Sequence, residues 1–232
     1  MNSDRGATVI GYWGPRTQPV EGIAAEVFSF LHSLRNIDPA LGQAWVFSPE
    51  TAFESTDLSV EGLAKIFRAA KDVEGQSVAA FDLGYIVSLL HPDRYQFLRI
   101  QFSLGRNVPR VPNLVNVTLP RPEKQAIGEA SQLLTARVGD AIMKAIIEHW
   151  SPESARWGTR EYRNAQGNEV SEIEVGWETY IQSGIDLDHS KLPVVAVLEE
   201  LPNGTLIRLG EKPLNVNFDD ILAVREALGY PV

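Results

Sequence analysis

The 232-residue sequence contains no cysteine. This absence excludes a disulfide-stabilised scaffold, a thiolate zinc site and a cysteine nucleophile. The sequence also lacks any apolar run near the ~20 residues that a membrane-spanning helix needs. Met1 to Arg5 lead into the chain without an apolar h-region or a small-residue cleavage site, so no secretory signal is expected. We therefore expect a cytoplasmic protein with no membrane partner.

Sequence motifs for nucleotide binding and for serine hydrolases are missing as well. The strongest candidate for chemistry is Asp186-Leu187-Asp188-His189, because two carboxylates and an imidazole could bind a divalent ion in a small metal-dependent hydrolase. This cluster has no second histidine at helical spacing, and it follows Ser183-Gly184 in a predicted loop. A solvated acidic loop is therefore the favoured interpretation. We predict no catalytic residue, no metal and no cofactor.

Acidic residues are concentrated towards the end of the sequence. The whole chain has a formal net charge of −9. Residues 167–232 contain 12 acidic and 4 basic residues, a net charge of −8, which leaves −1 for residues 1–166. Such a chain is unsuited to direct nucleic-acid binding, which needs clustered Lys and Arg, and suits a basic protein partner better. The alternative is that the acidic residues only confer solubility.

Apolar residues at helical spacing predict four helices. These helices are expected at residues 20–36, 59–71, 122 to about 149, and 218–228. Asp38-Pro39 ends the first helix, because proline disfavours a helical residue ahead of it. Asp57 or Ser59 is expected to cap the second helix, with Val60 facing inward. Asn217 and Gly229 are expected to bound the last helix.

Strands are predicted where apolar residues alternate with polar ones or form short continuous runs between turn signals. They are expected at residues 7–12, 78–90, 98–104, 114–119, 173–181, 194–201 and 205–209. Pro202-Asn203-Gly204 is a strong hairpin signal for the last two. Residues 151–169 are interpreted as a loop with one edge strand. The order predicts a single α+β domain over residues 1–232, with a mainly antiparallel sheet and helices packed on it.

The predicted strand at residues 173–181 carries an unusual row of acidic side chains. Trp177 is assigned to the core face, so Glu172, Glu174, Glu178 and Tyr180 are placed on the opposite face. Alternate residues of a strand lie about 6.6 Å apart, and three glutamates therefore make a row of about 20 Å. Like charges on one face cost stability unless something offsets them. The row is either a binding surface or an ordinary polar face.

Three short motifs give the sequence a family resemblance. They are Tyr12-Trp13-Gly14-Pro15-Arg16, Ile37-Asp38-Pro39-Ala40-Leu41 followed by Trp45, and Val175-Gly176-Trp177-Glu178-Thr179-Tyr180. With these motifs the sequence resembles the bacterial immunity protein 52 family, the antitoxins of polymorphic toxin systems. Tyr12, Trp13, Trp45 and Trp177 are expected to be core residues.

The resemblance implies an antitoxin without catalytic activity that binds one cognate toxin. Its typical partner is a nuclease of restriction-endonuclease fold, delivered between bacteria by a secretion system such as type VI. A nuclease channel is basic, so an acidic surface that occludes it is expected, with Tyr180 or Trp157 as an aromatic anchor. Binding away from the catalytic site stays an alternative, and the oligomeric state stays open. The candidate toxin-binding residues are Glu172, Glu174, Glu178, Tyr180, Asp186, Asp188, Glu199 and Glu200.

Overall fold

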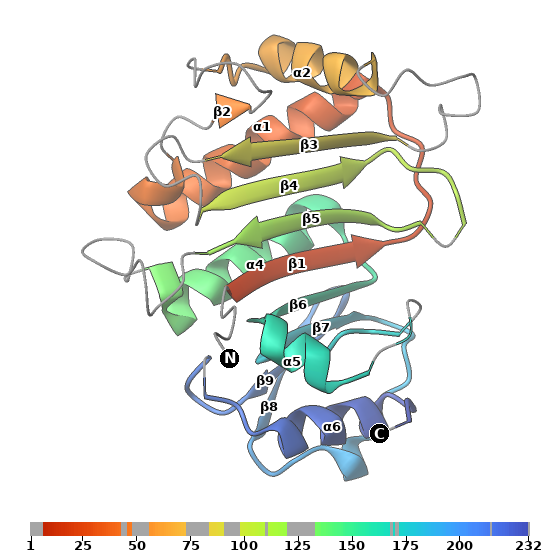
Figure 1. The fold of residues 1–232 in the computed structure, drawn as a ribbon. Coiled ribbons are helices and arrows are strands. Elements are labelled where there is room, and N and C mark those ends of the chain that lie inside the picture. The colour runs from red at the N-terminus through yellow and green to blue at the C-terminus, as the bar shows by residue number, and fades with distance from the viewer. Residues whose placement is uncertain are drawn as a thin grey trace.

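Within the described residues, nine strands form one antiparallel sheet in the order β2-β3-β4-β5-β1-β6-β7-β9-β8 (Figure 1). The computed structural model describes residues 7–42, 46–47, 56–72, 84–90, 98–109, 111–119, 133–167, 169, 172–213 and 215–231. The strands are β1 (Ala7–Trp13), β2 (Val46–Phe47), β3 (Tyr85–Leu90), β4 (Arg99–Leu104), β5 (Asn113–Thr118), β6 (Ser154–Thr159), β7 (Glu178–Gln182), β8 (Ala196–Leu201) and β9 (Gly204–Leu209).

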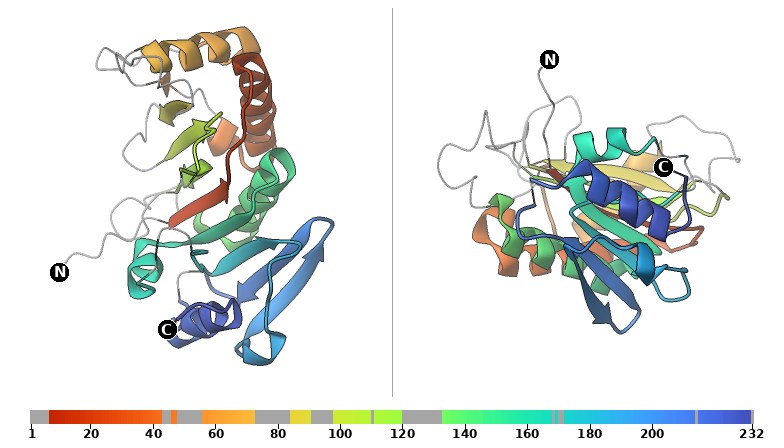
Figure 2. Two further views of the ribbon diagram at one scale, coloured as in Figure 1. Left: turned by 90° about the vertical axis from the view of Figure 1, so that its right-hand side faces the viewer. Right: turned by 90° about the horizontal axis from the view of Figure 1, so that it is seen from below.

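Helices pack on both faces of this sheet, but over different strands (Figures 1 and 2). The α-helices are α1 (Val20–Ile37), α2 (Val60–Asp72), α4 (Ala136–Trp150), α5 (Arg160–Ala165) and α6 (Phe218–Ala227). Helices α1 and α4 pack together behind β3, β4, β5 and β1 in the view of Figure 1, and α2 packs on α1 and β3. Helix α5 lies on the other side, where it packs on β6, and α6 packs on α5 and on the 3-10 turn at His189–Lys191. The fold class is therefore α+β, as the sequence predicts.

Aromatic residues fill the core between the sheet and the helices α1 and α4. Trp13 on β1 stacks on Trp150 at the end of α4, with ring centroids 5.7 Å apart. Phe30 of α1 and Phe102 of β4 contact each other edge to face beside this pair. Leu98, Ile100, Phe102 and Leu104 are all fully buried. These four alternate residues form the core face of the strand predicted at residues 98–104, and Trp13 is a core residue as predicted.

Local signals locate several elements within one or two residues. Helix α1 ends at Ile37, next to Asp38, and the Ser59 hydroxyl accepts a hydrogen bond from the Gly62 N–H at the start of α2. Asn217 caps α6 through its side chain, and Gly229 follows with a φ of +80°. The predicted hairpin joins β8 and β9. None of the helices in the described ranges is long and apolar enough to cross a membrane.

Several expectations from the sequence are wrong. Residues 154–159 form a buried strand inside the sheet, between β1 and β7, and are followed by α5, not by a loop. Helix α4 begins only at Ala136, because Thr135 is extended and caps it. Val60 faces outward, with 38% of its surface exposed. The predicted helix start at residues 122–132, the strand part at 78–83 and Trp45 lie outside the described residues.

Candidate functional site

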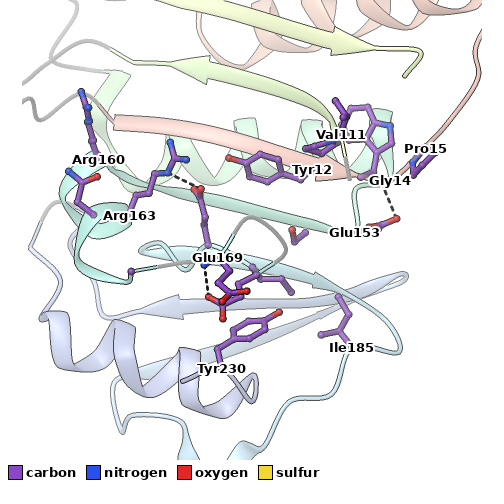
Figure 3. Close-up of a pocket in the computed structure, with 18 residues that line it drawn as sticks. Tyr12, Gly14, Pro15, Val111, Glu153, Arg160, Arg163, Glu169, Ile185 and Tyr230 are labelled. Atoms are coloured by element: carbon purple, nitrogen blue, oxygen red, sulfur yellow. Dashed lines mark hydrogen bonds and ion pairs between the residues drawn. The ribbon is translucent and has the colours of Figure 1, made fainter. Parts of the chain in front are cut away.

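The first sequence motif and the residues just before the last motif meet at one groove. A cavity of about 970 Å³ opens between the end of β1, helix α5 and the C-terminal segment (Figure 3). Tyr12, Gly14 and Pro15 line it from the first motif, and residues 172–174 line it just before the last one. The Glu153 carboxylate accepts a hydrogen bond from the Gly14 N–H at 3.1 Å and fixes the turn after β1. Tyr12 is thus half-buried at a groove rather than enclosed in the core.

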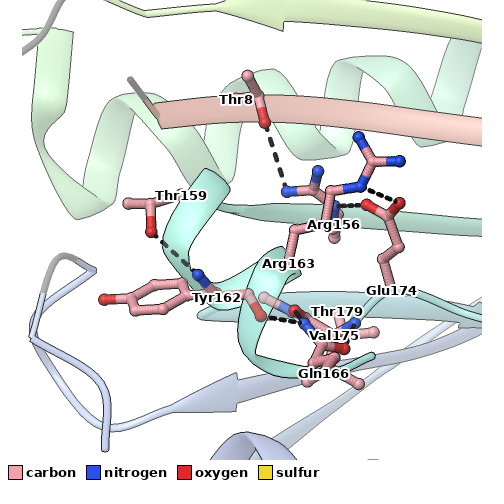
Figure 4. Close-up of polar contacts among 10 residues, drawn as sticks. Thr8, Arg156, Thr159, Tyr162, Arg163, Gln166, Glu174, Val175 and Thr179 are labelled. Carbon is pink, nitrogen blue, oxygen red and sulfur yellow. Dashed lines mark hydrogen bonds and ion pairs between the residues drawn. The ribbon is translucent and has the colours of Figure 1, made fainter. Parts of the chain in front are cut away.

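Glu174 joins two arginines at the floor of this groove (Figure 4). The Arg156 Nε on β6 donates to Glu174 Oε2, and the Arg163 Nε on α5 lies 2.9 Å from Oε1. Only 12% of the Glu174 side chain and 6% of the Arg156 side chain are exposed, so this ion pair is largely sheltered from water. Tyr12 lies beside the cluster, and burial raises the pKa of its hydroxyl while the nearby Arg156 charge opposes that rise. Glu174 therefore holds α5 against the sheet.

The segment before β7 is held by a side chain instead of by a neighbouring strand. The Gln166 amide accepts a hydrogen bond from the Val175 N–H at 2.8 Å and donates one to the Val175 carbonyl at 2.7 Å (Figure 4). Gly176 then passes so close to β6 that a Cβ atom would lie 2.2 Å from the Trp157 carbonyl oxygen. The glycine in the last motif is therefore required by the close approach of two backbones.

Glu172 is paired inside the protein as well. Its carboxylate accepts a hydrogen bond at 2.9 Å from Arg225 on α6, whose side chain is only 1% exposed. The same guanidinium donates to the Pro231 carbonyl at 3.1 Å and lies over the Tyr230 ring. Glu172 therefore ties the groove segment to α6 and to the C-terminal residues.

Glu178 is fully buried and lies opposite Arg208 on the neighbouring strand β9. The Arg208 Nε and Nη2 both lie 2.7 Å from Glu178 Oε1, and Nη2 also lies 2.6 Å from Asp140 on α4. The other carboxylate oxygen, Oε2, is buried without a hydrogen-bond partner among the described residues. Burial outweighs the arginine and raises the pKa of Glu178 to about 7.

The predicted solvated row of glutamates is therefore wrong. Strand β7 begins only at Glu178, so Glu172 and Glu174 lie on an irregular segment and do not continue its alternation. Glu178 to Ile181 of β7 are all buried, so both faces of the strand are covered, and Tyr180 and Trp157 are each 1% exposed. Neither aromatic residue is free to act as an anchor. Trp177, also 1% exposed, is the core residue that the sequence predicts.

The arginine partners are the part of this arrangement that the sequence interpretation missed. They are Arg156, Arg163, Arg208 and Arg225. A signal for two of them exists, because Arg156 and Arg208 stand alone between apolar neighbours in strand-like segments. A charged residue at such a position is buried only when it is paired. The partners lie 18 and 30 positions away along the chain, so the pairing itself is a tertiary feature.

The remaining candidate residues lie on the surface of the C-terminal part. Asp186, Asp188 and Glu200 are exposed, and Glu199 is partly exposed on β8, where Lys144 of α4 lies 2.8 Å from its carboxylate. Asp188 accepts hydrogen bonds from the Ser190 hydroxyl and N–H, which hold the pKa of its carboxyl below its usual value. These four residues, unlike the glutamates of the groove, can reach a partner.

Metal chemistry finds no support in the residues that the structure describes. They contain no group of three or more His, Asp or Glu side chains that could hold a metal ion, so Asp186, Asp188 and His189 do not form one. His149 has a structural role: its Nδ1 lies 2.7 Å from Glu26 and its Nε2 lies 2.9 Å from the Ser33 hydroxyl. The His149 ring thus joins α4 to α1.

Comparisons with known proteins agree with the family resemblance. The sequence profile of immunity protein 52 matches residues 8–226, and the chain belongs to this family. Among solved structures, the Pseudomonas aeruginosa T6SS protein PA0821 superposes with a TM-score of 0.60 at 8% sequence identity, covering 97% of this chain and 72% of that one. At this identity the similarity concerns the fold alone. No curated protein matches the sequence significantly.

Proposed function

We propose that this protein is an antitoxin that binds one cognate toxin, a nuclease of restriction-endonuclease fold, and occludes its basic channel. Membership of the immunity protein 52 family supports the antitoxin role. The structural neighbour is described as a T6SS protein, which supports delivery of the toxin through a type VI secretion system. The proposed compartment is the cytoplasm, where a producing cell would need protection. The proposed role needs neither a cofactor nor catalysis.

The electrostatic part of this proposal rests on the accessible carboxylates of Asp186, Asp188, Glu199 and Glu200, together called the acidic surface. They lie on more than one side of the C-terminal part, because Glu199 contacts Lys144 of α4 and Asp188 lies beside α6. Within the described part of the chain, neither Asp186 nor Glu200 takes part in an ion pair, in contrast to Glu172, Glu174 and Glu178. Residues 167–232 carry a net charge of −8. In a segment with this net negative charge, carboxylates without an ion-pair partner attract the Lys and Arg residues that a nuclease uses to bind phosphates.

The test is binding to the product of the adjacent toxin gene, inactivated by mutation of its catalytic residues. Asp186→Lys with Glu200→Lys should slow association severalfold, because charges at an interface rim act mainly on the association rate. Glu21→Lys with Glu61→Lys, on α1 and α2, is the matched control with the same change in net charge. If the unaltered protein neither binds this toxin nor protects cells that express its active form, the antitoxin proposal fails. Equal association rates for the two double variants would show that the acidic surface does not take part in toxin binding.

A further inference from the structure

Exposed apolar side chains gather at one end of the sheet. Val194, Val195 and Val197 are 103%, 45% and 56% exposed. Other large apolar residues with exposed surfaces, such as Phe28 on α1 and Ile86 on β3, stand singly in the sequence. Single exposed apolar residues are normal, whereas a contiguous group marks a surface that another molecule covers.

The valines lie at the outer edge of the sheet. Strand β8 pairs with β9 alone among the described strands, so its other side is an open edge. Gly210 N–H donates to the Val195 carbonyl, and Leu201 pairs with Gly204 across a two-residue turn. Hydrogen-bonding residues alternate along an antiparallel strand, so the backbone groups of Leu198 and Glu200 point away from β9. An edge of this kind accepts a strand from another chain.

A groove of about 650 Å³ lies beside this edge. The start of α4 forms one wall through Ala136 and Arg137, Val195 and Val197 form the other, and Trp177 lies at its base. Among the described helices, α4 alone reaches this face of β8 and β9, through the ion pairs Asp140–Arg208 and Lys144–Glu199, whereas α5 and α6 lie on the opposite side (Figure 2). The apolar side chains of a strand added to this edge can therefore enter the groove.

Acidic residues surround the groove and the edge. Asp140 and Glu211 line the groove, and Glu199 and Glu200 belong to the edge strand itself. Arg137 and Arg208 line the groove as well, and Asp140 and Glu199 are already paired with Arg208 and Lys144. Glu200 and Glu211, which take part in no ion pair within the described part of the chain, therefore remain beside the apolar side chains. They complement a strand in which basic and apolar residues alternate.

We infer that the open edge of β8 is the docking site for a strand of the toxin, which adds to the sheet as its next strand. Its apolar side chains enter the groove beside Val195 and Val197, and its basic side chains, on the opposite face, meet Glu200. The partner is taken to be the toxin because Glu200, Glu211 and the net charge of −8 on residues 167–232 favour a basic chain over a second copy of this acidic protein. This inference rests on the proposed function and specifies the surface that performs it.

Strand addition is tested with a proline on the outward side of the edge. Glu200→Pro removes an N–H that points away from β9, so it should leave the β8–β9 pairing and the unfolding midpoint nearly intact. Glu200→Gln is the matched control, since it removes the charge and keeps the N–H. The proline variant should bind the inactivated product of the adjacent toxin gene about tenfold or more weakly than the glutamine variant, the loss expected from one or two backbone hydrogen bonds.

The groove is tested separately with Val195→Ser and Val197→Ser, against Ile86→Ser as an exposed apolar control on β3.

Hydrogen exchange of the unaltered protein gives an answer even if the proline variant folds poorly. The amides of Leu198 and Glu200 should become protected when the inactivated toxin is added, and only then.

Three outcomes would overturn the inference, and each differs from a failure of the antitoxin proposal. If the unaltered protein binds the toxin while the edge variants bind equally well, the docking site lies elsewhere. Absence of protection at Leu198 and Glu200 in the complex leads to the same conclusion. If sedimentation shows the free protein to be a dimer that Glu200→Pro separates, a second copy occupies the edge. Only a lack of toxin binding by the unaltered protein speaks against the antitoxin role itself.

Discussion

Arg208 holds Glu178 across the β7–β9 pair, with Nε and Nη2 both 2.7 Å from the same carboxylate oxygen. The pair lies directly opposite in the strand register, and Glu178 has no exposed surface. A buried carboxylate with one unpaired oxygen is costly in its charged form even beside an arginine. Consequently, the last sequence motif contains an ionisable group whose protonation is coupled to folding.

The first prediction is a pH-dependent stability difference caused by Glu178. Its pKa is raised to about 7 in the folded protein, from an ordinary value of 4.5. Between these pH values the folded chain binds more protons at this site than the unfolded chain, so stability falls as pH rises through the window. Relative to the unaltered protein, Glu178→Gln should become more stable between pH 5 and pH 8, by up to about 3 kcal/mol.

Urea denaturation of both proteins at several pH values measures that difference. The comparison is made between proteins at each pH, because other carboxyls titrate in the same range. A difference in unfolding free energy that stays constant from pH 5 to pH 8 would show that Glu178 is charged throughout.

The second prediction is that Trp177 stabilises the core. Its ring meets Trp157 edge to face at 4.8 Å, and its Nε1 donates to the Gly210 carbonyl at 3.2 Å. Trp177→Ala should leave a cavity and cost about 3–5 kcal/mol of unfolding free energy. Phe28→Ala, at a residue that is 45% exposed, should change stability by less than about 0.5 kcal/mol. An unchanged melting midpoint for Trp177→Ala, together with lost toxin binding, would place the residue in the interface.

The third prediction concerns two glycines with opposite surroundings. Gly176→Ala should destabilise the protein strongly, because the new methyl group would meet the Trp157 backbone at 2.2 Å. Gly22→Ala in α1 meets only the Pro19 ring at 3.5 Å and should stabilise the helix by about 0.5–1 kcal/mol. Thermal unfolding of the two single variants decides this. Equal shifts of the midpoint in one direction would contradict the close approach of the two backbones.

The fourth prediction reverses an expectation from the sequence alone. If the glutamates formed a solvated row, changing Glu172, Glu174 and Glu178 to Lys would relieve repulsion and leave folding intact. In the structure each meets an arginine, Arg225, Arg156 or Arg208, so the triple change buries like charges side by side. Removing one partner of a buried ion pair already costs about 3–5 kcal/mol. The triple variant should therefore fail to fold, and a native circular-dichroism spectrum would contradict this.

The fifth prediction is a salt dependence of toxin binding. Exposed charges are screened over roughly 8 Å at physiological salt, so the association rate of the unaltered protein should fall as salt rises. Asp186→Lys with Glu200→Lys should lose much of that dependence, whereas the pair on α1 and α2 should retain it. Stopped-flow kinetics at low and high salt measure the slopes. A salt dependence unaffected by the first pair would show that the acidic surface does not guide association.

Local chemistry in the sequence determined a large part of the fold. The proline after Asp38 ends α1, Asn217 and Gly229 bound α6, and Pro202-Asn203-Gly204 joins β8 to β9. These signals act through neighbouring residues, so one sequence is sufficient to find them. The pattern of apolar and polar residues likewise located the strand at residues 98–104, and the three motifs pointed to the family that the profile match shows.

Only the tertiary structure decided what the charged residues do. Alternation implied that Glu174 and Glu178 are solvated, but it cannot show that β7 is covered on both faces. Their arginine partners come from β6, β9 and α5, and attraction between distant residues leaves no period in the sequence. The open edge of β8 is likewise a property of strand order. The sequence therefore fixed local elements and overall charge, whereas long-range packing selected which carboxylates are buried and which remain available to a partner.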